Sequence, residues 1–270
     1  MQSAGSPIDR FYAATLQRLV AEGRLDLAAR TLVVAGGDTD RRTLLHVGFT
    51  DVVVSNLDDR DSAPDMSPYA WMHLDAEDLD LPDGSFSQAV VHAGLHHCRS
   101  PHRALLEMHR VARDSIVVFE ARDNRLMRLA RQLGFTGDYE LDAVVVQGGT
   151  HGGMRNGPVP NYVYRWTERE FTKVLASYDP SGVVAARYFY GLRLPLERLR
   201  LAGSRGKLLL VGLATLPLRV LVRVAPRQGN EFAMWAATRR APWPWVRVVD
   251  GAPQLDPEGA ALQVGRRQRR

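Results

Sequence analysis

Hydrophobic positions along this chain alternate between two spacings. Apolar residues recur every three or four positions in the segments 8–27, 41–47, 101–112 and 167–178, which predicts helices there. Short runs rich in apolar and β-branched residues predict strands at 31–35, 51–55, 69–74, 87–92 and 115–120. Strands that alternate with helices indicate βαβ crossovers, and hence a mostly parallel sheet with helices on both faces.

The alternation stops after residue 122 and resumes at residue 165. Residues 146–160 are rich in Gly and Pro, so we expect an inserted loop or lid at about 123–165. Thr167, followed by Glu170, predicts a capped helix start, and further strands are expected at 183–190 and 231–238. The sequence predicts a helical cover at 1–30, one domain at 31–240 that includes the lid, and a loosely ordered basic tail at 241–270.

The composition fits one large α/β domain and limits the partners. The chain has 270 residues, 45% of them hydrophobic, which is enough for a sizeable core. Its net charge of +5 falls to +1 without the four arginines at 266, 267, 269 and 270. The remaining basic charge is dispersed among acidic residues, and this pattern does not indicate a nucleic-acid-binding protein.

Cysteine content and hydropathy bear on the compartment. Cys98 is the only cysteine, so no internal disulfide is expected and a reducing cytoplasm is the default location. The N-terminal residues 1–7 do not resemble a secretion signal. The apolar stretch 207–224 holds Pro217, Arg219 and Arg223, which argue against a bilayer crossing. We expect a packed helix there, with a helix lying on a membrane as the alternative.

Two strand ends carry candidate cofactor residues. After the first strand, Gly36 and Gly37 allow close approach of the backbone to a ligand at the edge where open α/β sheets bind nucleotides. The spacing fits neither G-x-G-x-x-G nor G-x-x-x-x-G-K-[ST], which argues against dinucleotide-binding and P-loop proteins. After the second strand, Asn56 stands where such sheets usually place an acid, and its amide oxygen can accept a bond from a ribose hydroxyl.

The densest pattern lies between residues 75 and 120. It consists of Asp75-Ala76-Glu77-Asp78-Leu79, Leu81-Pro82-Asp83-Gly84-Ser85-Phe86, the pair His96-His97, and Glu107, Arg110 and Val111. Together these residues resemble class I S-adenosylmethionine-dependent methyltransferases of the ubiquinone/menaquinone-biosynthesis type, the methyltransferase domain 11-like family. That family carries a D-A-E-x-L-P-F-P-D-G-S-F-D block, an H-H turn and an E-x-x-R-V helix. The resemblance runs from about residue 31 to residue 120.

The resemblance implies a fold and a cofactor. The fold is a Rossmann-like α/β sheet, mostly parallel with an antiparallel last strand and helices on both faces. The cofactor is S-adenosylmethionine, with the glycine loop facing its methionine part, the end of strand two at its ribose, and Asp75 and Ala76 at its adenine. The cofactor-binding residues implied in this way are Gly36, Gly37, Asp38, Asp40, Asn56, Leu57, Asp75, Ala76, Glu77 and His92.

The sequence departs from the family pattern in three places. The glycine loop reads Gly-Gly-Asp-Thr-Asp, strand two ends in Asn56, and the segment 111–114 lacks the usual Gly-Gly. Asp38 and Asp40 can compensate by meeting the amino group of the cofactor. These departures leave open a non-catalytic relative that acts as a binding partner.

Five of the eight histidines lie between residues 92 and 109. A metal site is the rival hypothesis, but adjacent His96 and His97 diverge unless the loop turns, and neither an H-E-x-x-H motif nor a second cysteine is present. We therefore predict no metal. Instead His96, with His97 as second choice, is predicted as the general base that deprotonates an acceptor hydroxyl. Alignment of acceptor, methyl and sulfur can also suffice without a base.

The lid segment supplies the candidate acceptor-binding residues. They are His151, Arg155, Tyr162, Tyr164 and Arg165. Such side chains suit a polyhydroxylated or anionic acceptor, although an ordinary surface loop has a similar composition. The predicted function is methyl transfer to a hydroxyl of a small molecule or glycan. Methyl transfer to carbon or nitrogen and a non-catalytic binding protein of the same fold remain the alternatives.

Overall fold

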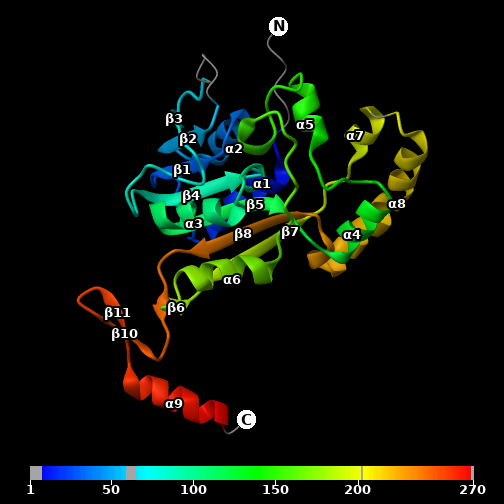
Figure 1. Cartoon of the computed structure of the whole chain (residues 1–270). Helices are drawn as coiled ribbons and strands as arrows, with labels where there is room; N and C mark the ends of the chain where they lie inside the picture. Colours follow the sequence, from blue (N-terminus) through cyan, green and yellow to red (C-terminus); the bar gives the residue numbers. More distant parts are fainter. Residues whose placement is uncertain (1–7, 59–64, 202, 269–270) are drawn as a thin grey trace.

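A seven-stranded sheet organises the chain, with the strand order β3-β2-β1-β4-β5-β8-β7 (Figure 1). The computed structural model describes residues 8–58, 65–201 and 203–268. The strands of the sheet are β1 (Thr31–Val34), β2 (Val52–Asn56), β3 (Ala70–His73), β4 (Phe86–His92), β5 (Ala112–Ala121), β7 (Ala186–Gly191) and β8 (Glu231–Ala237).

The directions of the strands confirm the predicted sheet. Strands β3, β2, β1, β4 and β5 pair in parallel, with Leu32 of β1 opposite Val53 of β2 and Ala89 of β4. Strand β8 is antiparallel to both of its neighbours, β5 and β7. The sheet is therefore mostly parallel, and its last strand in the chain runs against the others.

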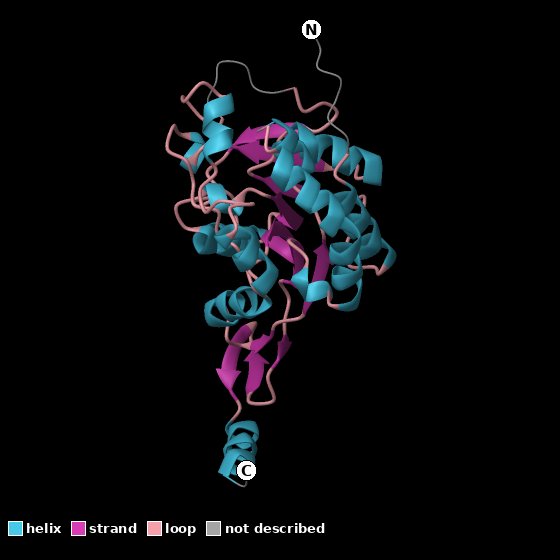
Figure 2. Ribbon diagram, turned by 90° about the vertical axis from the view of Figure 1, so that its right-hand side faces the viewer, coloured by secondary structure: helices cyan, strands magenta, loops and turns pink. Residues whose placement is uncertain are grey.

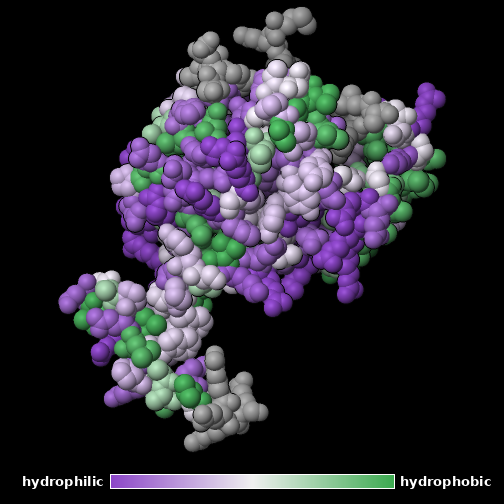
Figure 3. Space-filling view, viewed as in Figure 1, coloured by the Kyte–Doolittle hydropathy of each residue, from purple (hydrophilic) through white to green (hydrophobic). Residues whose placement is uncertain are grey.

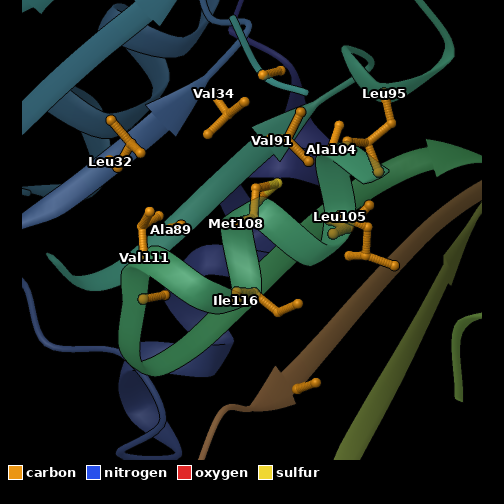
Figure 4. Packing of buried hydrophobic residues seen from close by; sticks show 14 of the residues in the cluster. Leu32, Val34, Ala89, Val91, Leu95, Ala104, Leu105, Met108, Val111 and Ile116 are labelled. Carbon is orange, nitrogen blue, oxygen red and sulfur yellow. The ribbon is translucent and has the colours of Figure 1, made fainter. Parts of the chain in front are cut away.

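Helices cover both faces of the sheet and divide the core into two layers (Figure 2). Helices α1 (Arg10–Ala21) and α2 (Asp38–Val47) lie on one face, and α3 (Pro101–Val111) and α6 (Glu168–Tyr178) lie on the other. Successive residues of β1 alternate between the layers, because side chains of a strand point to opposite faces. Thus Leu32 packs with Met108 of α3, while Val33 packs with Tyr12 of α1. Figure 4 shows the first of these layers.

The segment predicted as a lid forms short helices after β5. They are α4 (Arg125–Gln132), α5 (Leu141–Val146) and the 3₁₀ turn η2 (Met154–Asn156). The segment folds back on itself through a bridge between Tyr139 and Tyr162, and it returns to the sheet where Trp166 pairs with Arg122. Thr167 caps α6 and forms the predicted capping box with Glu170.

Helix α8 differs from the packed helix expected at 207–224. It follows α7 (Leu196–Leu201), spans Arg205–Val224 and leads into the 3₁₀ turn η3 (Pro226–Gln228). Several of its apolar side chains are exposed, including Leu213 and Leu216. Figure 3 shows hydrophobic surface at the edge of the molecule where Figure 1 draws α8. An apolar period cannot show which surface a helix will cover. No helix of the described residues combines the length and apolarity needed to cross a membrane.

The C-terminal part also differs from the expected loosely ordered tail. Strands β6 (Gly182–Val183) and β9 (Ala241–Pro242) pair, β10 (Val246–Val249) and β11 (Ala252–Leu255) form a hairpin, and α9 (Pro257–Gln268) follows. Hairpin and helix extend away from the main sheet (Figures 1 and 2). The last two residues, 269 and 270, lie outside the described part of the chain.

Candidate functional site

A pocket opens where β1, β2 and β4 end at their carboxyl edge. Its walls come from the loops that follow these strands, from the loop after β3 and from the lid turn η2. The lining residues are Ala35, Asn56, Leu57, Leu74, Asp75, Ala76, Glu77, Gly94, His97, Cys98, Arg155 and Asn156. This edge is where parallel α/β sheets bind nucleotides. The pocket thus brings together seven of the predicted site residues.

Close packing of the strand ends requires glycine at position 36, next to the pocket residue Ala35, although neither Gly36 nor Gly37 is among the lining residues. A Cβ added at Gly36 would lie 2.6 Å from a methyl carbon of Val33 and 2.9 Å from one of Val54. The Gly36 N–H donates to the Ser55 carbonyl at 2.8 Å, and the Asn56 side-chain amide donates to the Gly36 carbonyl, also at 2.8 Å. Since the Asn56 nitrogen is used in this way, its amide oxygen is the atom that can accept a bond from a ribose hydroxyl.

The acidic residues after β3 are held by backbone and by the lid. Asp75 accepts from the Glu77 N–H at 2.9 Å and pairs with Arg155 at 2.7 Å. Glu77 accepts from the backbone N–H groups of Arg99 and Ser100 at 3.0 and 2.9 Å, and from Arg155 at 3.3 Å. Glu77 therefore fixes the loop before α3, while Arg155 covers the Asp75 carboxylate.

Three of the predicted cofactor residues are engaged elsewhere. Asp38 pairs with Arg41 at 2.6 Å on the surface of α2. Asp40 is buried, accepts from the Gly37 N–H at 2.9 Å and from the Tyr12 hydroxyl at 3.1 Å, and burial raises the pKa of its carboxyl. His92 stacks on Tyr12, with ring centroids 4.4 Å apart. Asp40 and His92 thus hold α1 and α2 against each other and against the sheet, and none of the three side chains lines the pocket. Gly37 is the N-cap of α2.

The two predicted bases converge with two glutamates. The 3₁₀ turn η1 (Leu95–His97) brings the His96 and His97 rings to a centroid distance of 4.6 Å, although the sequence led us to expect divergence. His96 Nδ1 lies 2.7 Å from a carboxylate oxygen of Glu120. Glu140 Oε2 lies 3.3 Å from His96 Nε2 and 3.4 Å from His97 Nε2. We call His96, His97 and Glu140 the histidine cluster.

Charge and burial act against each other in the histidine cluster. Burial lowers the pKa of His96, but Glu120 and Glu140 outweigh this effect and raise it to about 10. The hydrogen bond to His96 lowers the pKa of Glu140 to about 2. The pKa of His97 is lowered by burial and by the neighbouring His96 charge. Without another cation, a pKa of about 10 keeps the proton on His96 at neutral pH, which argues against His96 as the predicted general base and leaves His97, whose pKa is lowered, as the neutral imidazole.

The predicted acceptor-binding residues lie in three places. Arg155 lines the cofactor pocket, while His151 lies in the lid beside the Thr150 hydroxyl at 2.7 Å. The other three predicted residues line a second groove formed by α4, the end of the lid and α6. Its lining residues are Asp123, Met127, Arg128, Arg131, Tyr162, Tyr164, Arg165 and Glu170.

Glu120 and Glu140 are functional candidates that the sequence analysis did not name. Glu120 lies near the carboxyl end of β5, beside the end of β4, so the strand-end rule that selected Asn56 could also have selected it. Glu140 lies in the lid just before α5, and nothing in its sequence neighbourhood indicates that it meets His96.

Fold and pocket together define a Rossmann-like α/β protein with a pocket at the strand ends, the edge at which such sheets bind nucleotide-type ligands. Residues 35–119 match the family model described as a methyltransferase domain. This match spans the glycine loop, Asn56, the segment 75–79 and the histidine pair, which confirms the resemblance found in the sequence. Residues 35–119 therefore form a methyltransferase domain, and S-adenosylmethionine is the cofactor to which this domain points. A comparison with curated protein sequences gives no match.

Solved structures share the fold at low sequence identity. The YcgJ protein from Bacillus subtilis has a TM-score of 0.53 and 11% identity, with 86% of this chain and 100% of that chain covered. Magnesium protoporphyrin IX methyltransferase from Synechocystis PCC 6803, solved with bound S-adenosylhomocysteine, has a TM-score of 0.49 and 12% identity over 85% and 82%. A methyltransferase from Methanosarcina mazei has a TM-score of 0.46 and 14% identity, with 81% of this chain and 96% of that chain covered. At 11% identity the likeness to the Bacillus subtilis protein concerns the fold alone.

Proposed function

We propose that this chain transfers a methyl group from S-adenosylmethionine to a hydroxyl of a small molecule or glycan. The observation that carries the proposal is that His97 lines the same pocket as Asn56, Asp75 and Ala76. A cofactor whose adenosine lies on the strand-end residues would carry its methyl group toward the side of the pocket where the histidine cluster stands.

The cofactor contacts that we propose follow from the resemblance and from this shared pocket. The Asn56 amide oxygen accepts from the ribose hydroxyls. The Asp75 carboxylate accepts from the exocyclic amine of adenine, and the backbone N–H of Ala76 donates to the adenine ring. In the structure the Arg155 guanidinium pairs with the Asp75 carboxylate. The adenine amine must therefore displace Arg155 from this carboxylate when the cofactor binds.

The proposed reaction forms one bond and breaks two. The acceptor oxygen attacks the methyl carbon in line with the sulfur, the carbon–sulfur bond breaks, and its electron pair stays on sulfur. The O–H bond also breaks, and the proton leaves toward His97, the neutral imidazole of the histidine cluster, and from there to solvent. One S-adenosylhomocysteine, one methyl ether and one proton result from each turnover. Alignment of oxygen, carbon and sulfur supplies much of the rate in such a step.

The acceptor is proposed from the chemistry of the lid. Tyr162, Tyr164 and Arg165 offer hydroxyl and guanidinium groups in the second groove, and such groups suit a polyhydroxylated or anionic molecule. His151 lies in the same lid. We propose that the reaction takes place in the cytoplasm, because a single cysteine fits a reducing compartment.

The test is a screen of hydroxylated small molecules and glycans with S-adenosylmethionine, read by mass spectrometry. We expect a product that gains one methyl group, formed with one equivalent of S-adenosylhomocysteine. The control is Asp75→Ala, which should lower product formation at limiting cofactor. A product methylated on carbon or nitrogen would contradict hydroxyl methylation and leave methyl transfer standing.

A further inference from the structure

The histidine cluster holds its donor atoms at the spacing of metal ligands. One donor atom each from His96, His97 and Glu140 lies within 4.8 Å of the other two. The two distances to Glu140 Oε2 are 3.3 and 3.4 Å. A tetrahedral zinc ion with ligands at about 2.1 Å holds its ligand atoms about 3.4 Å apart. The two distances to Glu140 thus already match such an ion, and the donor atoms of the two histidines, at most 4.8 Å apart, would close around it.

A hydrogen-bond acceptor near Nδ1 also orients each imidazole of the cluster. His96 Nδ1 lies 2.7 Å from the buried carboxylate of Glu120, and His97 Nδ1 lies 3.3 Å from the carbonyl oxygen of Gly153. These two acceptors favour a hydrogen on each Nδ1, which leaves the Nε2 lone pairs on the side of Glu140. Metal-binding histidines are usually held by a carboxylate or a backbone carbonyl in this way.

We propose that His96, His97 and Glu140 form a binding site for one divalent ion of the zinc type. Two imidazoles and one carboxylate are the donor set of several catalytic zinc sites, in which a fourth position stays open. The charges of Glu120 and Glu140 together match one divalent cation. The turn of η1 removes the objection that adjacent histidines diverge.

The role of this ion rests on the proposed function. His97 lines the cofactor pocket, so the open position of the ion lies near the place of methyl transfer. An acceptor hydroxyl bound there would lose its proton more readily, because a bound cation stabilises the oxygen anion. The ion would also fix the oxygen in line with the methyl group. The binding of the ion itself does not depend on turnover.

The test starts from the full chain stripped of metal with a chelator and titrated with Zn²⁺ in a calorimeter. We expect one zinc per chain. His97→Ala and Glu140→Gln each remove a ligand and should lower the affinity about a hundredfold or more. Glu120→Gln, which only loosens the orientation of His96, should lower it roughly tenfold to a hundredfold. His46→Ala is the matched control, because His46 is exposed on α2 outside the cluster. The zinc affinity of this variant should equal that of the wild type.

Binding of less than one zinc per chain, or equal affinity in His97→Ala, Glu140→Gln and the wild type, would overturn the site. A second measurement does not depend on how the variants fold. The wild-type chain loaded with Co²⁺ should show the intense visible absorption of tetrahedral cobalt, and the weak spectrum of octahedral cobalt would contradict the proposed geometry.

Failure of the site and failure of the proposed function can be told apart. Zinc binding without any response to S-adenosylhomocysteine would contradict the proposed function and leave the site standing. Methyl transfer at full rate in the chelator-treated chain would contradict the role of the ion and leave the function standing.

Discussion

Asn56 and Asp75 reach one pocket from two strands because parallel strands end at the same edge of a sheet. This rule, applied to the sequence, selected Asn56 and Leu57, and the family resemblance selected Asp75 and Ala76. All four residues line the pocket. The rule could not show that the Asp40 carboxylate accepts hydrogen bonds from Gly37 and Tyr12, because the bond from Tyr12 depends on how α1 packs. Nor could it find Glu140, which comes to His96 through the fold of the lid.

Cys98 lines the pocket but should react slowly. Burial, together with the charges of Glu77, Glu120 and Asp75, raises the pKa of its thiol to about 12. Since only the thiolate reacts, alkylation of the folded chain at pH 8 should be on the order of a thousandfold slower than that of a free cysteine. The measurement is iodoacetamide labelling followed by mass spectrometry, with the denatured chain as control. Equal rates in the folded and denatured chain would contradict this expectation.

His109 should make the fold sensitive to acid. Burial and the charge of Arg240 lower its pKa to about 4, and its buried Nε2 has no hydrogen-bond partner within the described residues. The unfolded chain, with a histidine pKa of about 6.5, therefore takes up the proton first as the pH falls. The contribution of neutral His109 to the free energy of unfolding is fully present above about pH 6.5. This contribution is lost progressively as the pH falls from about 6.5 to about 4.

The measurement is urea unfolding at pH 7.5 and pH 5 for the wild type and His109→Leu. Between these pH values the wild type should lose about 2 kcal/mol more of its unfolding free energy than the variant, which has no proton to take up at this position. Parallel losses in the two proteins would show that His109 is not the group responsible.

At the scale of elements, the sequence predicted the strands of the main sheet better than it predicted β6 and the packing of α8. The short apolar run at 31–35 and the largely apolar run at 87–92 predict strands covered on both faces, and they are β1 and β4. The run at 183–190 forms two strands, because residues 182–183 pair with β9 while β7 pairs with β8. The spacing of apolar residues in α8 predicted a helix but not the exposure of its apolar side chains. Such spacing does not indicate which other element, if any, packs against the helix.

The lid turn η2 should act as a latch on the cofactor pocket. Arg155 adopts a left-handed backbone conformation, with φ 52° and ψ 40°, while its side chain pairs with Asp75 and Glu77. The adenine amine needs the same Asp75 carboxylate. Breaking a partly exposed ion pair costs on the order of 1 kcal/mol, so Arg155→Gln should bind S-adenosylhomocysteine about fivefold more tightly.

Calorimetric titration of this variant tests the latch, with Arg128→Gln as control. Arg128 lies in α4 and pairs with Asp123, away from the cofactor pocket. Weaker binding by Arg155→Gln would indicate instead that Arg155 holds the ligand directly.

At the scale of the whole molecule, the site joins the two parts of the chain that the sequence set apart. The sheet supplies Asn56, Asp75 and Glu120, and the lid supplies Arg155 and Glu140. The strand-end residues and the family motif were visible in the sequence because they are local. The contacts between sheet and lid link residues far apart in the chain, such as His96 and Glu140, and only the folded chain reveals them.

The central claim is that the strand-end pocket binds S-adenosylmethionine through Asn56 and Asp75. The most direct measurement is calorimetric titration of the full chain with S-adenosylhomocysteine, for the wild type, Asn56→Ala and Asp75→Ala. We expect one site per chain and a loss of about tenfold in affinity for each variant, the value of one good hydrogen bond to a charged or partly buried group. No binding to the wild type, or equal binding by all three proteins, would contradict the claim.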